Sequence, residues 1–248
     1  MAATPPKKDG AAAREMERRD TAAAEITLIR HGEPDWSPGG GQSVIDPPLT
    51  AHGNAQARCV AKAVAQYKLD AIFVSPLRRA QETAAPLAEA TGLTPVTLEG
   101  LAEIEVGAAG RSQEEVDQYF QEAMRRPLEE HWEGWPDGES FRNFHRRVTE
   151  GAEDMLSRHG MRSEKQYDFT VWQVPPTRPS IAIVAHAGTN AVLLTHLLDV
   201  RPVPWEWMRF ECELASHSIL HTRELSQGYV WSLQNFNEVD SLRAAGLR

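Results

Sequence analysis

The sequence of 248 residues contains only two cysteines, Cys59 and Cys212, and they lie far apart along the chain. A disulfide framework needs several cysteines, and a CxxC metal site needs two that are close in sequence, so both are excluded. Long apolar runs are missing as well. No stretch approaches the ~20 consecutive apolar residues that a membrane-spanning helix requires. We therefore predict a soluble, cytoplasmic protein that has no membrane partner.

Positive charge is also scarce. The chain carries 26 Lys and Arg residues against 35 Asp and Glu residues, which gives a formal net charge of −9. Proteins that bind nucleic acids usually present a basic patch, so we predict no nucleic-acid partner. An anionic substrate would have to be attracted by local positive groups, because the overall field repels it.

The first 24 residues differ in composition from the rest of the chain. They consist mainly of Ala, Pro, Lys, Arg and Glu, with no apolar face and no apolar core of the kind that a secretory signal contains. We predict a disordered tail over residues 1–24 and one domain over residues 25–248. The composition of 41% hydrophobic and 25% charged residues is typical of a globular chain of this length.

Short apolar runs alternate with helical patterns from residue 25 onward. Strands are predicted at residues 26–29, 71–74, 181–184, 218–222 and 229–234. Helices are predicted at residues 50–67, 79–91, 112–124, 140–159 and 189–198. Apolar strands separated by helices indicate a parallel sheet covered on both faces. We therefore predict an α/β fold with three α/β/α layers around a mostly parallel central sheet. The segment of residues 161–179 is too long for a simple connection between a helix and the next strand. Its length predicts an excursion with its own hairpin or edge strand.

Charged or imidazole side chains directly follow three of the predicted strands. Arg30 and His31 follow the first strand, Arg78 and Arg79 follow the second, and His186 follows the third. Open parallel sheets bind ligands beyond the carboxyl ends of their strands. Arginines near helix N-termini bind phosphate, and an imidazole beside them can act as a nucleophile. Taken alone, Arg30-His31 also fits a surface turn, Arg78-Arg79 a solvated helix start, and His186 a structural histidine. The three together predict a phosphoryl-transfer site.

The residues around these strand ends form motifs in a definite order. They are Leu28-Ile29-Arg30-His31-Gly32-Glu33, Pro48-Leu49-Thr50-Ala51-His52-Gly53, Ser75-Pro76-Leu77-Arg78-Arg79-Ala80-Gln81-Glu82-Thr83-Ala84, Leu101-Ala102-Glu103-Ile104, Gly138-Glu139-Ser140 and Val184-Ala185-His186-Ala187-Gly188. From residue 25 to about residue 200, the chain resembles the histidine phosphatase superfamily, the phosphoglycerate-mutase-like proteins. The run from Ser75 to Ala84, in register with Arg-His-Gly, makes the resemblance specific.

The resemblance implies roles for four of these side chains. His31 resembles the nucleophile that becomes phosphohistidine, and Arg30, Arg79 and His186 resemble the groups that hold the phosphoryl oxygens. Arg79 is chosen over Arg78 because it directly precedes the Ala of the motif. Two adjacent guanidinium groups would also disfavour the charged form of His31, and only the neutral imidazole can attack phosphorus.

The resemblance also implies an acid and two further substrate contacts. Glu103 resembles the acid that protonates the leaving oxygen, and Glu105 is the alternative if the register is off by two. Ser37 stands where many family members carry an Asn that touches phosphate. Gly188 completes the expected substrate-binding set.

Residues 101–138 resemble the helical cap that covers the site in this family. This segment contributes Trp132 and Trp135, and Trp36 follows the first motif. Two interpretations remain open. The tryptophans either pack the cap onto the sheet or form an apolar wall for a carbon-rich leaving group.

We therefore predict a phosphatase of the histidine acid phosphatase type that hydrolyses phosphate monoesters with neither metal nor cofactor. Its expected partner is a phosphorylated small molecule, while a phosphoprotein substrate and a homodimer are left open. The alternatives are a cofactor-dependent phosphoglycerate mutase and a non-catalytic phosphate-binding scaffold. The mutases carry a characteristic Arg-containing run after Arg-His-Gly-Glu, whereas residues 34–43 contain no arginine, which favours the phosphatase.

Overall fold

The computed structural model of the chain describes residues 23–40, 44–107, 112–135 and 137–248. Residues 1–22 of the predicted tail lie outside the described residues. Ala24, which was predicted to belong to the tail, is fully buried. Its backbone N–H donates to Thr222 Oγ1 at 2.9 Å, and the Thr222 N–H donates to the Ala24 carbonyl at 2.9 Å. Ala24 therefore belongs to the core of the domain.

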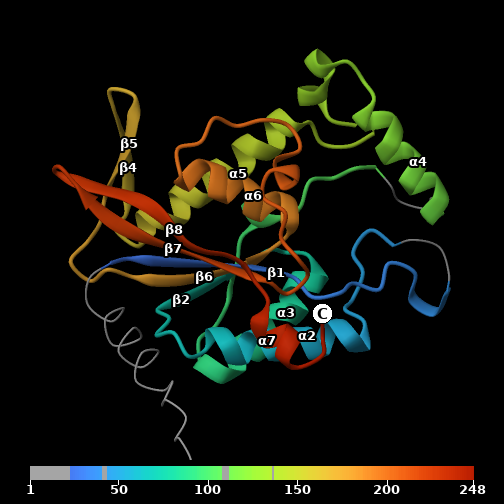
Figure 1. The fold of residues 1–248 in the computed structure, drawn as a ribbon, viewed down its shortest axis with the longest axis horizontal. Helices are drawn as coiled ribbons and strands as arrows, with labels where there is room; N and C mark the ends of the chain where they lie inside the picture. The colour runs from blue at the N-terminus through green and yellow to red at the C-terminus, as the bar shows by residue number, and fades with distance from the viewer. Residues whose placement is uncertain (1–22, 41–43, 108–111, 136) are drawn as a thin grey trace, which may run out of the picture.

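An eight-stranded sheet forms the centre of the molecule, in the order β3-β2-β6-β1-β7-β8-β5-β4 (Figure 1). The strands are β1 (Glu25–Arg30), β2 (Ala71–Val74), β3 (Val96–Thr97), β4 (Arg162–Gln166), β5 (Phe169–Gln173), β6 (Ser180–Ala185), β7 (His217–Leu225) and β8 (Gly228–Glu238). The three strands that were predicted to carry the site are β1, β2 and β6. They lie side by side, with β6 pairing in parallel with both β1 and β2.

The sheet is mixed, so the prediction of a mostly parallel sheet is wrong. The pairs β1–β6, β2–β6 and β2–β3 are parallel, whereas β1–β7, β7–β8, β5–β8 and β4–β5 are antiparallel. The chain forms two hairpins, β4–β5 and β7–β8, and strands joined by so short a turn can only run antiparallel. The hairpin β4–β5 lies in the excursion that was predicted for residues 161–179.

Helices pack on both faces of the sheet (Figure 1). They are α2 (Ala51–Val64), α3 (Arg78–Thr91), α4 (Gln113–Met124), α5 (Phe141–Arg158), α6 (Ala187–Leu197) and α7 (Asp240–Ala244), together with the short 3-10 turns η1 (Pro38–Gly40), η2 (Glu99–Leu101), η3 (Leu128–Glu133) and η4 (Glu206–Met208). Neighbouring strand residues alternate between two apolar clusters, because successive side chains point to opposite faces. In β1, Leu28 packs in the cluster that contains α5 and α6, and Ile29 packs in the cluster that contains α2, α3 and α7.

Side-chain caps set the starts of three helices. Thr50 accepts from the Gly53 N–H at the start of α2, and Ser140 accepts from the Asn143 N–H at the start of α5. Ser112 and its N3 residue form a reciprocal capping box at the start of α4. These helices accordingly begin within one residue of the predicted positions. No helix in the described part of the chain is long and apolar enough to cross a membrane.

Helices α4 and η3 lie within the segment predicted to be the cap, part of which falls outside the described residues. Trp135 is buried in this region and packs edge-on against Phe120 of α4, with ring centroids 5.3 Å apart. Trp135 also packs against Trp205, with centroids 5.1 Å apart. An aromatic cluster thus joins α4 to the loop before η4, while closure of this segment over the site stays a prediction.

Candidate active site

The predicted site residues converge where β1, β2 and β6 end. His31 directly follows β1, and its backbone N–H donates to the Ala185 carbonyl at the end of β6. His186 follows β6 as the N-cap residue of α6. The rings of His31 and His186 lie 5.1 Å apart between centroids. Because β1 and β6 are parallel neighbours, the two imidazoles that follow them come into contact although they are far apart in the sequence.

His31 is held in the form that a nucleophile requires. Its Nδ1 lies 2.7 Å from the Gly32 carbonyl oxygen, which can only accept, so Nδ1 carries the proton and Nε2 keeps its lone pair. The ring is 5% exposed. Burial, followed by the charges of Arg79 and Arg30, holds the pKa of His31 well below its usual value, against the opposing hydrogen bond to Gly32. A neutral imidazole with a free lone pair is competent to attack phosphorus.

Arg30 and Arg79 supply buried positive charge with unused donors. Arg30 Nη1 donates to the Cys212 carbonyl, and Arg79 Nη1 lies 3.9 Å from Asp46 Oδ1. Among the described residues, Arg30 Nε and Arg79 Nε and Nη1 have no hydrogen-bond partner although they are buried. Leaving a buried donor unpaired costs about 1–3 kcal/mol, and an anion with several oxygens would satisfy these donors. Burial lowers the pKa of both guanidinium groups.

Glu103 lies beside these cations. Its Oε1 accepts from the Ile104 N–H at 3.0 Å, and its Oε2 accepts from the Gly188 N–H at 2.8 Å. Burial raises the pKa of the Glu103 carboxyl, although the two amide hydrogen bonds and both arginines oppose this shift. A carboxyl with a raised pKa stays protonated closer to neutral pH and can act as a general acid. Glu105, the alternative acid, is exposed.

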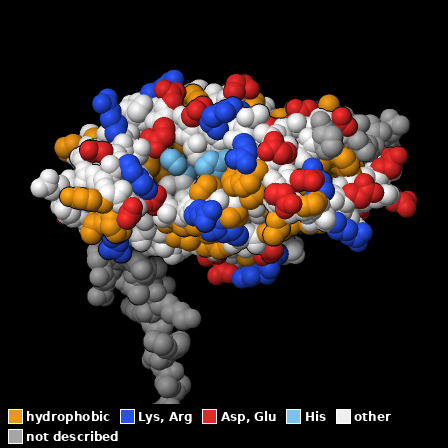
Figure 2. Space-filling model, turned by 90° about the horizontal axis from the view of Figure 1, so that it is seen from above, with side chains coloured by type: hydrophobic (Ala, Val, Ile, Leu, Met, Phe, Trp, Pro, Cys, Tyr) orange, Lys and Arg blue, Asp and Glu red, His pale blue; other side chains and the backbone are white. Residues whose placement is uncertain are grey.

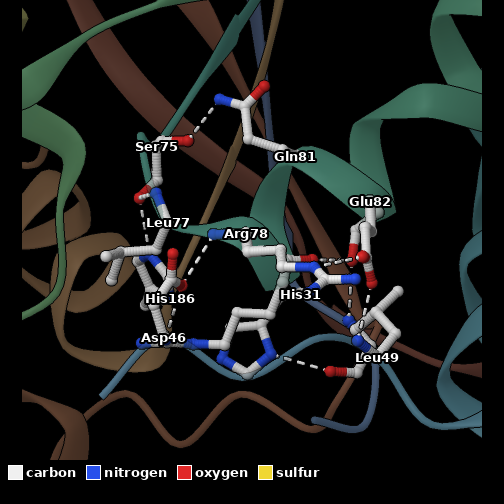
Figure 3. A network of polar contacts seen from close by, with 12 residues as sticks. His31, Asp46, Leu49, Ser75, Leu77, Arg78, Gln81, Glu82 and His186 are labelled. Atoms are coloured by element: carbon white, nitrogen blue, oxygen red, sulfur yellow. Dashed lines mark hydrogen bonds and ion pairs between the residues drawn. The ribbon is translucent and has the colours of Figure 1, made fainter. Parts of the chain in front are cut away.

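The structure adds Ser75 to the site, a residue not among the predicted site residues. Ser75 is fully buried, and a hydrogen bond of 2.7 Å joins its Oγ to Nε2 of His186. The Gln81 amide donates to the Ser75 carbonyl at 2.6 Å, and the Leu77 N–H donates to its hydroxyl. Figure 3 shows this network around the end of β2 and the first turn of α3. The sequence signal that could have identified Ser75 is its position, because Ser75 follows β2 directly, as His31 follows β1.

His186 is fully buried, and Ser75 accounts for one of its two ring nitrogens. The other, Nδ1, has no hydrogen-bond partner within the described residues. Burial, then the neighbouring His31, Arg79 and Arg30, holds the pKa of His186 well below its usual value. This ring is therefore neutral and retains one nitrogen for a further contact.

Ser37 and Gly188 are the two remaining predicted substrate contacts, and that role stays a prediction. Ser37 is exposed, and its backbone N–H donates to Asp35 at 3.3 Å. Within the described residues, its hydroxyl makes no hydrogen bond to the buried cluster. The amide of Gly188 is already used by Glu103. A Cβ at position 188 would lie 2.5 Å from Glu103 Oε1 and 3.0 Å from Trp207 Cε3, so the lack of a side chain permits this close approach.

The three tryptophans were predicted either to pack the cap onto the sheet or to form an apolar wall at the site, and they are placed differently. Trp135 is buried in the aromatic cluster described above, and Trp132 lies under the Arg142 guanidinium at 5.3 Å. Trp36 is 42% exposed, and Arg79 Cζ lies 5.2 Å from its ring centroid. Packing therefore accounts for Trp132 and Trp135, whereas Trp36 borders the site.

In the part of the chain that the structure describes, no group of three or more His, Cys, Asp or Glu side chains is placed to hold a metal ion. The positive charge of the cluster comes from its two arginines. The arrangement can therefore bind an anion with several oxygens, present a neutral imidazole to it and donate a proton from a carboxyl group.

Comparisons with known proteins bear on the family of the chain. The family model of the histidine phosphatase superfamily (branch 1) matches residues 26–237. Phosphoserine phosphatase 1 of Hydrogenobacter thermophilus is 30% identical over 203 residues, covering 81% of this chain and 87% of that protein. The probable phosphoglycerate mutase GpmB of Yersinia enterocolitica is 34% identical over 212 residues, covering 83% of this chain and 90% of that protein.

Among solved structures, a mycobacterial glucosyl-3-phosphoglycerate phosphatase is similar with a TM-score of 0.63 and 26% identity, covering 87% of this chain and 99% of that chain. The family match runs from β1 into β8 and includes every buried side chain of the cluster. Sequence match, fold and the convergence of the two histidines with the two arginines agree, and the chain belongs to the histidine phosphatase superfamily.

Proposed function

We propose that the protein is a phosphatase that hydrolyses phosphate monoesters through a phosphohistidine on His31. The observation that carries this proposal is the neutral His31 ring, buried between two guanidinium groups whose donors are unused. The transferring phosphoryl group spreads negative charge over three oxygens, so fixed positive charge and positioning supply most of the catalysis. Arg30 and Arg79 provide that charge, and we propose that no metal ion or cofactor is required.

The proposed reaction has two steps, and both use His31 and Glu103. His31 Nε2 attacks phosphorus, the bond from phosphorus to the ester oxygen breaks, and Glu103 gives its proton to the leaving oxygen. Water then attacks the phosphohistidine while the Glu103 carboxylate takes a proton from it. The N–P bond breaks, inorganic phosphate leaves, and His31 and Glu103 return to their starting forms. His186, held by Ser75, contributes its free ring nitrogen to the phosphoryl oxygens.

The names of the relatives leave two activities to weigh, phosphatase and mutase. A mutase must keep water from its phosphoenzyme and bind a substrate carboxylate while the intermediate reorients. Between Glu33 and Arg58 the sequence offers no arginine for this purpose. This absence supports hydrolysis. The presence of both histidines and both arginines argues against a scaffold without activity.

The substrate that we propose is a phosphorylated small molecule. Two of the relatives named above are phosphatases whose names specify such compounds, phosphoserine and glucosyl-3-phosphoglycerate. The acid-phosphatase subtype and a homodimer stay predictions.

Replacing the nucleophile tests this function. His31→Ala is expected to abolish turnover and the phosphoenzyme, since no other imidazole follows β1 directly to take its place. Incubation with a radiolabelled monoester followed by rapid quench should trap a base-stable, acid-labile phosphoryl adduct on the native enzyme and none on the variant.

The matched control is His52→Ala, which removes an exposed imidazole on α2. It should leave both the adduct and turnover unchanged. Thermal unfolding of all three proteins verifies that they are folded. Normal turnover by a folded His31→Ala variant would refute the assignment of the nucleophile.

A further inference from the structure

The position of Glu103 is not set by secondary structure. Residues 102–107 follow η2 without regular backbone hydrogen bonding. The amides that bind the Glu103 carboxylate belong to its own neighbour, Ile104, and to Gly188. Contacts from elsewhere must therefore hold the backbone of this segment against α6.

Arg147, from the middle of α5, grips the backbone just before Glu103. Its Nη1 donates to three carbonyl oxygens, those of Glu99 at 3.4 Å, Gly100 at 3.1 Å and Ala102 at 3.1 Å. The Glu99 carbonyl also accepts from the Ala102 N–H at 3.1 Å, which is the last hydrogen bond of the turn. The carbonyls of Gly100 and Ala102 come after that bond, and the guanidinium supplies a donor to them. A single side chain thus fixes three peptide groups within four residues of the acid.

Glu139 holds the other edge of the same guanidinium. Its Oε1 accepts from Arg147 Nε at 3.1 Å, and its Oε2 accepts from Arg147 Nη2 at 2.7 Å. The Glu139 backbone N–H donates to the carbonyl of Glu105 at 2.7 Å. Gly138 permits this approach, because a Cβ there would lie 2.2 Å from that same oxygen. The pair therefore contacts the chain on both sides of Glu103.

Packing against α5 and α6 reinforces these contacts. Gly100 and Gly151 approach so closely that a Cβ on Gly100 would lie 3.2 Å from the Gly151 Cα. The Thr189 hydroxyl, from α6, donates to the Ala102 carbonyl at 3.1 Å. The Arg147 and Glu139 side chains are only 29% and 18% exposed, so water screens their pairing less than it screens a surface pair.

We propose that the Glu139–Arg147 pair is the positioning device that holds residues 99–105 so that the Glu103 carboxyl meets the leaving oxygen. This inference rests on the proposed function, in which Glu103 is the general acid. In the proposed mechanism the pair acts through the backbone next to Glu103 and not by binding the substrate, and the charge of Arg147 also adds to the lowering of the pKa of His186. The motif Gly138-Glu139-Ser140 thereby acquires a role in the site, which the sequence alone did not give it.

The test is Arg147→Lys, because an ammonium lacks the planar fork that serves a carboxylate and three carbonyls together. We expect kcat/KM for an alkyl phosphate to fall about tenfold and that for p-nitrophenyl phosphate by less than about threefold, since only the alkyl leaving group needs the acid. In a Glu103→Gln background, the same substitution should cause no further loss on the alkyl ester. Equal losses on the two substrates, or additive losses in the double variant, would overturn the proposal.

Arg142→Lys is the matched control on the same helix. Arg142 pairs with Glu133, and these side chains are 61% and 68% exposed. This change should leave the rates on both substrates unchanged. A tenfold loss on the alkyl ester in this variant would show that any weakening of α5 has the effect, and would contradict a specific role for Arg147.

A readout that does not depend on turnover separates this inference from the proposed function. Amide hydrogen exchange at Ile104 and Gly188 should be faster in Arg147→Lys than in the native protein, while Ile183 in the buried strand β6 keeps its native rate. Unchanged exchange at Ile104 and Gly188 would reject the positioning role. A native protein that hydrolyses no monoester would instead reject the proposed function, and the exchange measurement would still stand.

Discussion

Burial shifts the pKa values of His31 and Glu103 in opposite directions. Desolvation disfavours whichever form is charged, so it lowers the pKa of His31 and raises the pKa of Glu103. The arginines add to the first shift and oppose the second. The lowered pKa keeps the His31 ring free to attack, and the raised pKa lets the Glu103 carboxyl hold its proton closer to neutral pH. The same physical effect therefore prepares both partners for the first step.

Glu103→Gln should consequently slow substrates with poor leaving groups far more than p-nitrophenyl phosphate. An amide cannot give a proton, and general acid catalysis is typically worth ~10²–10⁴-fold. With an alkyl phosphate, native kcat/KM should fall as the pH rises through the raised pKa of Glu103, because the acid is then lost. The variant should lack this alkaline limb.

The measurement is kcat/KM against pH for native enzyme and variant on one alkyl ester, so that ionisation of the substrate is common to both curves. An alkaline limb that persists in Glu103→Gln would assign it to another group. Equal losses on the alkyl and nitrophenyl esters would move the acid role to Glu105 or to no carboxylate.

At the scale of elements, the loop that follows β1 and the start of α2 touch backbone to backbone. A Cβ on Gly53 would lie 2.1 Å from the Glu33 carbonyl oxygen, and one on Gly32 would lie 2.6 Å from the Gly53 carbonyl oxygen. The Gly32 N–H also donates to the Thr83 hydroxyl of α3. These contacts dock the loop after His31 onto the first turn of α2 and the second turn of α3.

Gly53→Ala should therefore destabilise the protein, although alanine normally favours a helix by about 0.5–1 kcal/mol over glycine. We expect a loss of about 1–3 kcal/mol in the free energy of unfolding, because the new methyl group meets backbone that cannot rotate away. Urea unfolding measures it. Lys62→Ala, exposed on the same helix, is the control and should stay within about 0.5 kcal/mol of the native protein. A Gly53→Ala variant as stable as that control would contradict the close contact.

At the scale of the whole molecule, the net negative charge of the chain repels the anionic substrate that we propose for the site. The formal net charge is −9, and Figure 2 shows acidic side chains gathered toward the end of the molecule where α4 lies. Helix α4 and η3 carry Glu114, Glu115, Asp117, Glu122, Glu129, Glu130 and Glu133. Attraction of a phosphate ester must therefore come from local positive groups, and Arg30 and Arg79 are the ones whose charge acts on His31.

The whole protein should consequently release phosphate from monoesters and interconvert little 2- and 3-phosphoglycerate. The sequence between Glu33 and Arg58 supplies no guanidinium to hold a second anionic group, so we expect water to intercept the phosphohistidine. A coupled enolase assay from 3-phosphoglycerate, run beside a phosphate-release assay, compares the two activities. Both assays repeated in EDTA test whether the built-in positive charge suffices. Mutase turnover that bisphosphoglycerate stimulates above hydrolysis, or activity restored only by added metal, would contradict this prediction.

The sequence determined much of the site by itself, because its signals are local. Each of β1, β2 and β6 is a short apolar run, and the residue types that follow it are those that bind and attack phosphate. Strand ends in a parallel unit meet at one edge, so the order of residues along the chain is enough to predict that His31, Arg79 and His186 lie together. The helices predicted to begin at Thr50, Ser112 and Ser140 begin within one residue of those positions. The structure shows why: each of the three side chains accepts a hydrogen bond from a backbone N–H three positions further on, which is a local contact.

Tertiary structure alone decided the rest, because the partner of a polar group is not encoded near it in the chain. Ser75 meets His186 across 111 residues of sequence, and Arg147 reaches carbonyls more than 40 residues away. Strand β4, Arg-Ser-Glu-Lys-Gln, has no apolar pattern, and its pairing with β5 is what makes it a strand. The sheet is mixed because β7 pairs antiparallel with β1 and β8, and β5 pairs antiparallel with β8 and β4. Hydrophobic periodicity reports which face of an element is buried, whereas the choice of partner across the fold depends on how the elements pack.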